Sequence, residues 1–275
     1  MANTWQRRLR NRLLPEGRLK NHLRVFYQNA FRSKSFRVSF NGRYFTHHLS
    51  GGLKVKSFDI IWRELQEALD LYVRHSDVHE GDTVIDAGAM WGAFTLQAAI
   101  KAGRAGRVIA FEPDPVSFER LERNVRLNDL TNVTLVREGL WNGSGEMAFA
   151  ARSDMTSTLY HSDGEPLVPV CVCALDQKLR ELGIGSIDVL KMDIEGAEIE
   201  ALEGAQRTLQ ASDANLAVAS YHVVNGETTS TRVEQLLLDA GYRAWTEGTM
   251  WAVTYGARAR ERTDGPPFYP DKCLT

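Results

Sequence analysis

The sequence predicts an α/β fold in which a mostly parallel sheet carries helices on both faces. From Asp82 onward, short apolar segments alternate with stretches whose apolar residues recur at helical spacing. Repeated strand–helix units of this kind form parallel sheets, because each helix crosses back over the sheet before the next strand begins. Strands are expected at residues 83–87, 107–111, 133–136, 187–192 and 216–221, and helices at 94–100, 116–127, 197–209 and 231–240.

Two further segments, 242–245 and 250–255, flank a Glu247-Gly248 turn signal. A short turn joins antiparallel strands, so this pair is expected to close the sheet with an antiparallel last strand. The sheet would then have seven strands. Residues 146–150 and 167–172 are predicted to form additional strands.

The first 80 residues have a different pattern and are predicted to form an extension of helices and a short hairpin. Residues 4–31 have helical spacing that Pro15 and Gly17 interrupt, and residues 57–75 form a second helical pattern. Residues 36–45 alternate about Asn41-Gly42, which predicts a hairpin, and His47 with His48 belongs to it as structural residues. The expected organisation is an extension at 1–80, a main domain at 81–256 and an irregular tail at 257–275.

Charge is distributed unevenly along the chain. Residues 1–43 contain eleven Lys or Arg residues and a single acid, Glu16, so this arm carries ten net positive charges and residues 44–275 carry a net charge of −12. The arm has three interpretations: a cap packed on the sheet, peripheral contact with an anionic membrane, or contact with nucleic acid. No RNA-binding motif supports the last, so a nucleic acid partner is not expected.

Composition indicates a protein of a reducing compartment. Three cysteines make no disulfide framework, there is no apolar run of about 18 residues, and the N-terminus lacks a signal-peptide pattern. We expect a cytoplasmic protein that is peripheral to a membrane if the basic arm binds one.

The first predicted strand leads into a glycine-containing turn, Asp86 to Gly92. Ligands of open parallel sheets bind outside the carboxyl ends of the strands. Gly88 suits a tight turn there, and Gly92 lets the next helix approach the strand. The spacing is G-x-x-x-G and not G-x-G-x-x-G, so a pyrophosphate is not the favoured ligand.

The second predicted strand ends at Glu112, whose carboxylate can accept both hydroxyls of a ribose. Asp114 and Ser117 have a simpler interpretation as caps of the following helix. After the third strand, the loop with Gly139, Leu140 and Trp141 is placed to cover an adenine, although Leu140 and Trp141 suit the core equally well.

Acids and a histidine follow the later strands. Asp193 ends one strand, Glu195 and Glu198 begin the next helix, and His222 follows the strand after it. Asp193 could hold or deprotonate an acceptor, Glu195 could reach the site, and His222 titrates near neutrality and suits a general base. The alternatives are a packed His222, a Glu198 that complements the helix dipole, and a divalent cation held jointly by Asp193, Glu195 and His222.

Three motifs resemble the FkbM family of S-adenosylmethionine-dependent methyltransferases, over roughly residues 83–255: D-A-G-A-M-W-G-A-F-T at 86–95, F-E-P-D-P at 111–115 and D-V-L-K-M-D-I-E-G-A-E at 188–198. The resemblance implies a Rossmann-like class I methyltransferase fold with S-adenosylmethionine as cofactor. The family usually has Asn-Ile where Met90-Trp91 stands. The cofactor residues implied are Asp86, Gly88, Ala89 and Gly92 on the methionine part, Glu112 on the ribose, and Pro113, Gly139, Leu140 and Asp193.

The expected reaction is therefore in-line methyl transfer to a hydroxyl of a small-molecule or glycan acceptor, with Asp193, His222 and Glu195 as catalytic candidates. No metal site is assigned, and a divalent cation stays an alternative. Two other functions remain open: a nicotinamide-dependent oxidoreductase, because Glu112 also suits that ribose, and a non-enzymatic nucleotide-binding module that uses the basic arm.

Overall fold

The structure, a computed structural model, describes residues 17–32, 37–49, 52–150, 167–224 and 226–258. The predicted helical segment at 4–16 and the tail from residue 259 lie outside these ranges. Within the described ranges, no helix is long and apolar enough to cross a membrane.

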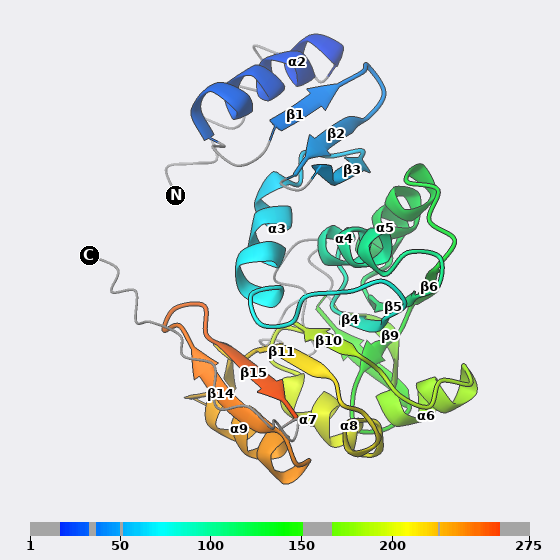
Figure 1. The fold of residues 1–275 in the computed structure, drawn as a ribbon, viewed down its shortest axis with the longest axis vertical. Coiled ribbons are helices and arrows are strands. Elements are labelled where there is room, and N and C mark those ends of the chain that lie inside the picture. The colour runs from blue at the N-terminus through cyan, green and yellow to red at the C-terminus, as the bar shows by residue number, and fades with distance from the viewer. Residues whose placement is uncertain (1–16, 33–36, 50–51, 151–166, 225, 259–275) are drawn as a thin grey trace.

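A seven-stranded sheet forms the centre of the molecule (Figure 1). Its strand order is β14-β15-β11-β10-β4-β5-β6. The strands are β4 Thr83–Ala87, β5 Arg107–Phe111, β6 Val133–Val136, β10 Val189–Met192, β11 Asn215–Ala219, β14 Arg243–Glu247 and β15 Val253–Ala257. Strand β15 pairs antiparallel with both β11 and β14, whereas the pairs from β11 to β6 are parallel. The predicted α/β class, strand number and antiparallel last strand are confirmed.

Each buried strand supplies a core on both faces of the sheet, because successive side chains point to opposite sides. Ile85, Leu190 and Leu216 pack on one face with helices α6 Leu175–Glu181, α7 Glu198–Glu203, α8 Gln206–Ala211 and α9 Ser230–Asp239. Val84 and Val189 pack on the other with α4 Ala93–Ala102, and α5 Pro115–Leu127 lies beside α4. This two-sided burial explains the continuous apolar runs of the central strands.

Strand register places the functional turns at one edge. Met192 pairs with Ala87 of β4 and with Val218 of β11, so the segments that follow these three strands leave the sheet together. Gly88, Asp193 and the Ser220–His222 segment therefore meet at the carboxyl ends of the parallel strands, where ligands of such sheets bind.

A small second sheet, β7-β9-β8, lies beside the main one and carries the loop expected to cover an adenine. Its strands are β7 Gly139–Leu140, β8 Gly145–Phe149 and β9 Val168–Cys173, and the predicted additional strands correspond to β8 and β9. A short ladder of β12 Val223–Val224 with β13 Glu227–Thr228 follows the main site and was not predicted.

The N-terminal extension contains helix α2 Arg18–Tyr27, a π-helical turn η1 Gln28–Arg32, and a three-stranded antiparallel sheet, β1 Arg37–Phe40, β2 Phe45–His48 and β3 Lys54–Ser57. The predicted hairpin is present, with Asn41 accepting hydrogen bonds from Arg43 N and Tyr44 N in the turn. His47 is buried and neutral in character: burial lowers its pKa to about 4, and the Ile61 N–H donates to Nε2 at 3.2 Å.

Two predicted helices have the wrong extent. The 57–75 helix begins later, because β3 reaches Ser57, and it consists of α3 Trp62–Glu67 and a π-helical turn η3 Ala68–Tyr72. The 197–209 helix is two helices separated at Gly204, where an added Cβ would lie 2.2 Å from the Trp141 carbonyl oxygen. A distant backbone segment causes this break, so local spacing could not reveal it.

Candidate active site

The turn after β4 is packed directly against the end of β10. Gly88 has a φ of +75° and Met90 a φ of +50°. A Cβ on Gly88 would lie 1.8 Å from the carbonyl oxygen of Asp193, so only glycine permits the two segments to touch. Gly92 begins α4 with a φ of +93°, and its Cβ would lie 2.8 Å from Leu121 of α5. Gly92 therefore lets the start of α4 pack closely against α5, whereas the sequence predicted that it would let α4 approach the strand.

Asp86 and Lys191 form a buried ion pair beneath this turn. The Lys191 Nζ lies 3.1 Å from Asp86 Oδ1, and Thr95 donates its hydroxyl hydrogen to Asp86 Oδ2. Lys191 also donates to the carbonyl oxygens of Ala87 and Gly88. Asp86 is fully buried and, like Gly92, lines neither cavity described below, so these two residues shape the turn from behind.

Glu112 lies at the end of β5 with both carboxylate oxygens held by backbone. Met90 N donates to Oε2 at 2.7 Å and Asp114 N donates to Oε1 at 2.9 Å. Burial raises the pKa of Glu112 to about 7, although these two N–H donors act to lower it. Asp114 accepts from Val116 N and Ser117 N and caps α5, as its position in the sequence suggested.

A cavity of about 760 Å³, partly open to solvent, borders Glu112. We call it the Glu112 cavity. Its lining includes Glu195 and six of the residues expected on a cofactor, namely Gly88, Glu112, Pro113, Gly139, Leu140 and Asp193. Leu140 is also part of the sheet's core, whereas Trp141 packs on the second sheet with Phe149 and Val172.

A second cavity of about 830 Å³ lies on the other side of the Gly88 turn. We call it the Trp251 cavity. Its lining combines aromatic and acidic side chains, among them Tyr72, Trp91, Phe94, Trp251, Glu64 and Glu67, and it includes Ala89. Gly88, Met90, Asp193 and Tyr221 line both cavities, so the two spaces meet at these residues. No sequence pattern indicated the second cavity, because α3 and η3, which line it, come from the extension.

Asp193 stands at this junction with its carboxylate held by two tyrosines. Tyr72 donates to Oδ2 at 2.8 Å, and Tyr221 donates to Oδ1 at 3.5 Å. Burial is the main cause that raises the pKa of both tyrosines, and the charge of Asp193 adds to it, so both remain protonated donors. Neither tyrosine was among the predicted site residues.

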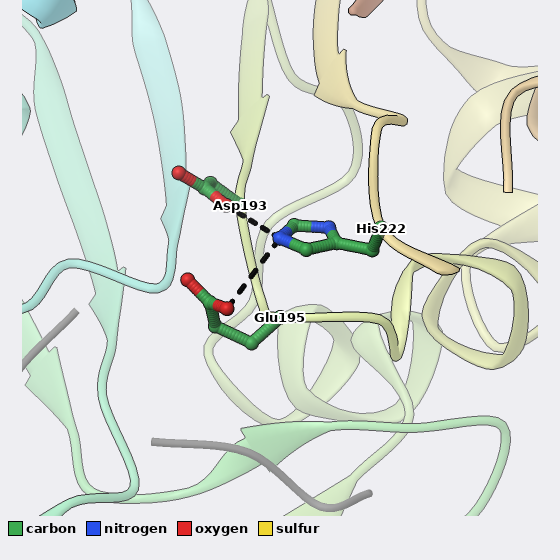
Figure 2. Close-up of side chains that lie close together, drawn as sticks. All are labelled: Asp193, Glu195 and His222. Atoms are coloured by element: carbon green, nitrogen blue, oxygen red, sulfur yellow. Dashed lines mark ion pairs between the residues drawn. The ribbon is translucent and has the colours of Figure 1, made fainter. Parts of the chain in front are cut away.

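His222 lies beside three carboxylates, of which Figure 2 shows those of Asp193 and Glu195. Its Nε2 is 3.7 Å from Asp193 Oδ1 and 3.6 Å from Glu195 Oε2, and its Nδ1 is 3.0 Å from Glu198 Oε1. Burial acts to lower the pKa of His222, but Glu195, Glu198 and Asp193 outweigh it and raise the pKa to about 10. The expectation that His222 titrates near neutrality, as a general base should, is therefore wrong.

Glu198 does more than complement a helix dipole. It is fully buried, and its Oε1 accepts hydrogen bonds from Ile194 N and Gly196 N while facing the His222 ring. It thus fixes the loop that carries Glu195, a residue whose φ of +57° is unusual outside glycine. The three predicted catalytic residues Asp193, Glu195 and His222 are brought together in the folded chain.

Comparison with known proteins assigns the family. The model of the methyltransferase FkbM domain matches residues 79–244, which is more than half of the chain. The chain belongs to the FkbM methyltransferase family. Its sheet and helices have the class I methyltransferase fold that the motifs implied.

Two relatives of this FkbM-family chain carry informative names. Methyltransferase sdnD of Sordaria araneosa is 29% identical over 204 residues, covering 62% of this chain and 76% of the relative. Hexuronic acid methyltransferase AglP of Haloferax volcanii is 28% identical over 171 residues, covering 61% and 69%. The solved FkbM methyltransferase of Methylobacillus flagellatus is 19% identical, with a TM-score of 0.48 over 70% of this chain and 50% of that one.

Proposed function

We propose that this FkbM-family protein transfers the methyl group of S-adenosylmethionine to a hydroxyl of a sugar-like acceptor. The observation that carries the proposal is the junction of two cavities at Gly88 and Asp193. One cavity borders a carboxylate suited to a ribose, and the other has the aromatic and acidic lining of a sugar site. A methyl group would pass between them.

The Glu112 cavity fits the nucleoside. Each Glu112 oxygen accepts one backbone hydrogen bond and retains capacity for a ribose hydroxyl. Pro113, Gly139 and Leu140 would face the adenine, and Gly88 would let the backbone approach the methionine part. When bound, S-adenosylmethionine supplies an electrophilic methyl group on a sulfonium leaving group.

At the junction, the chain's task is to align the acceptor oxygen and manage its proton. Asp193 is placed for this, because Tyr72 and Tyr221 hold its carboxylate at the mouth of both cavities. The role proposed for Asp193 is to accept a hydrogen bond from the acceptor hydroxyl and to orient it for in-line attack. His222 then acts as a positioning residue for the carboxylates of Asp193 and Glu195.

The lining of the Trp251 cavity favours a neutral sugar ring. Burial raises the pKa of both Glu64 and Glu67, and their carboxyl oxygens can accept hydrogen bonds from sugar hydroxyls. Among the described lining residues the one cation is Lys191, which Asp86 already pairs. The name of the Haloferax volcanii relative supports a sugar acceptor. Without a free cation in the lining, however, a uronate acceptor is disfavoured here.

Calorimetric titration with S-adenosylmethionine, S-adenosylhomocysteine and NAD tests the cofactor. We expect the two sulfur nucleosides to bind wild type and to lose affinity in Glu112→Ala. Mass spectrometry of neutral hexosides and hexuronides incubated with enzyme and cofactor then tests the acceptor, with a gain of one methyl group on the neutral sugars expected. Binding of NAD alone would overturn the proposal in favour of an oxidoreductase. If none of the three ligands bound, a non-enzymatic binding module would be favoured.

A further inference from the structure

The three side chains in Figure 2 present one oxygen or nitrogen each to a common point. Ligand atoms of Asp193, Glu195 and His222 all lie within 4.8 Å of one another. The distances from His222 Nε2 to the two carboxylate oxygens, 3.7 and 3.6 Å, are too long for hydrogen bonds. They leave a gap that an ion coordinated by all three could occupy.

The orientation of the His222 ring supports this interpretation independently. Only 9% of its side chain is exposed, and neither ring nitrogen makes a hydrogen bond with a described residue, so Nδ1 meets Glu198 as an ion pair and Nε2 is left toward the two carboxylates. The opposite nitrogen, Nδ1, lies 3.0 Å from the buried Glu198 Oε1. Metal-binding histidines are commonly held in this way, because a carboxylate behind the ring fixes its orientation and directs the other nitrogen to the metal.

We propose that Asp193, Glu195 and His222 bind one divalent cation at the junction of the two cavities. Two carboxylates and one imidazole suit a first-row ion such as Mn²⁺ or Zn²⁺ better than Mg²⁺, which prefers oxygen ligands alone. Binding displaces the proton that His222 otherwise carries. In an ion that accepts five or six ligands, such as Mn²⁺, three protein ligands would leave positions for two neighbouring hydroxyls of an acceptor.

This inference rests on the proposed function and narrows the acceptor to one with a vicinal diol. A cation held there would lower the pKa of a coordinated hydroxyl, whose proton would pass to solvent. The oxygen then forms a bond to the methyl carbon as the carbon–sulfur bond breaks, and S-adenosylhomocysteine leaves. Asp193 orients the hydroxyl in this scheme through the cation as well as directly.

Titration of the full-length, cofactor-free protein with Mn²⁺ alone tests the site by calorimetry. We expect one saturable site per chain, and a loss of affinity of at least about tenfold in His222→Ala and in Glu195→Gln. Glu203→Gln, which changes an exposed carboxylate on the same helix α7, serves as the matched control and should bind as wild type. Circular dichroism melts verify that each variant is folded.

The outcomes separate this inference from the proposed function. A folded protein that binds S-adenosylmethionine but no Mn²⁺ or Zn²⁺ overturns the cation site and leaves the methyltransferase proposal standing. Mn²⁺ binding that survives both His222→Ala and Glu195→Gln also overturns it, because the ion then binds elsewhere. Failure of S-adenosylmethionine binding in a protein that binds Mn²⁺ contradicts the proposed function alone.

A second surface, on helix α2 and turn η1, carries an independent inference. Their large apolar side chains face outward: Leu19 is 68% exposed, Phe26 67% and Phe31 71%, with Leu23 and Tyr27 between them. By contrast, Lys20 and Gln28 of the same segment are 4% and 5% exposed. This segment buries polar residues and exposes its apolar ones, which is the reverse of a helix that packs on its own core.

Charge around this apolar face indicates what covers it. Residues 17–58 contain no Asp or Glu and nine Lys or Arg residues, among them the exposed Arg18 and Arg24 at α2. Large apolar side chains bordered by cations suit the interface of an anionic lipid bilayer, where the apolar groups enter the acyl boundary and the cations contact headgroups. Nucleic acid would use the cations but leave the apolar face exposed.

We infer that α2 and η1 dock the enzyme on an anionic membrane surface. Sedimentation of the full-length protein with phosphatidylcholine vesicles, with and without phosphatidylglycerol, tests this. Binding is expected only to the anionic vesicles, and Phe26→Ser with Phe31→Ser should reduce it by about tenfold or more. Leu238→Ser, at an exposed apolar residue of α9, is the matched control. Binding to RNA without vesicle binding, or a dimer in light scattering that the double variant dissociates, would contradict the inference.

Discussion

Gly88 and Asp193 lie in contact although they are 105 positions apart in the chain, and a Cβ on Gly88 would lie 1.8 Å from the Asp193 carbonyl oxygen. Parallel pairing of β4 with β10 brings them together. The residue that shapes the turn for the cofactor therefore also sets the position of the residue proposed to orient the acceptor. Any change at Gly88 should disturb both halves of the site.

Gly88→Ala is accordingly expected to be severe. The residue has a positive φ and its Cβ would overlap a backbone atom that cannot rotate away, so we expect a loss in the free energy of unfolding of more than about 3 kcal/mol. Urea denaturation followed by circular dichroism measures this. Gly143→Ala is the control, because nothing lies within 4 Å of its Cβ position. Equal stability of the two variants would show that the contact is not formed.

Affinity for S-adenosylmethionine should depend on pH through Glu112. Its pKa of about 7 means that the carboxylate is mostly protonated at pH 6 and mostly ionised at pH 8. The ionised form accepts hydrogen bonds from both ribose hydroxyls, so the dissociation constant at pH 6 should be about tenfold higher than at pH 8. Calorimetry at the two pH values measures it. Glu112→Ala should bind S-adenosylmethionine weakly, with a dissociation constant that does not change with pH. If the wild-type dissociation constant were also the same at both pH values, a residue other than Glu112 would bind the ribose.

The same raised pKa makes a separate prediction for the stability of the cofactor-free protein. Because the folded-state pKa lies above the ordinary value of 4.5, the fold favours the protonated carboxyl, and stability is lost as the pH rises. The free energy of unfolding should therefore fall between about pH 4.5 and pH 7 by up to about 3 kcal/mol from this group. Urea titrations across that range, compared with Glu112→Ala, isolate the contribution. If the free energy of unfolding changed with pH equally in wild type and Glu112→Ala, this prediction would be wrong.

Lys191→Met should destabilise the protein far more than the loss of an exposed ion pair would. Asp86 is fully buried, so removing its partner leaves an uncompensated charge, at a cost of about 3–5 kcal/mol. The double variant Asp86→Asn with Lys191→Met should recover most of that loss. Arg126→Met, which breaks an exposed pair with Glu122, is the control and should cost at most about 1 kcal/mol. A double variant no better than Lys191→Met would show that the two residues are not coupled.

Trp251→Ala tests the acceptor side of the site. Trp251 lines the second cavity and packs edge-on against Tyr221 at 5.0 Å, so its ring is placed to stack on a sugar. We expect the KM for a neutral sugar acceptor to rise roughly fivefold, about what one aromatic contact contributes, while the dissociation constant of S-adenosylmethionine stays unchanged. Met250→Ala, a change at an exposed neighbour outside the cavity, should alter neither. If only the dissociation constant of S-adenosylmethionine rose, Trp251 would contact the cofactor and not the acceptor.

The central sheet was predictable because its signals are local. Apolar strands alternate with helical spacing from Thr83 onward, and Glu247-Gly248 marks the closing turn, so strand number and pairing direction followed from neighbouring residues. The meeting of Asp193, Glu195 and His222 was also accessible, because parallel strands end at one edge.

The remaining features depend on contacts between distant segments. Tyr72 reaches Asp193 from the extension, across 121 positions, and nothing in its sequence neighbourhood indicates a site. The pKa of His222 depends on Glu198, whose place at the start of a helix suggested only a dipole interaction. Met90 has a left-handed φ, a conformation that asparagine tolerates better than methionine, and nothing in its sequence neighbourhood indicated it.

Gly88, Met90, Asp193 and Tyr221 line both cavities and lie between the space proposed for the donor and the space proposed for the acceptor. Donor and acceptor would each approach these residues from their own side, so neither needs to leave before the other can exchange. A spent donor could then be replaced while the acceptor stays in place.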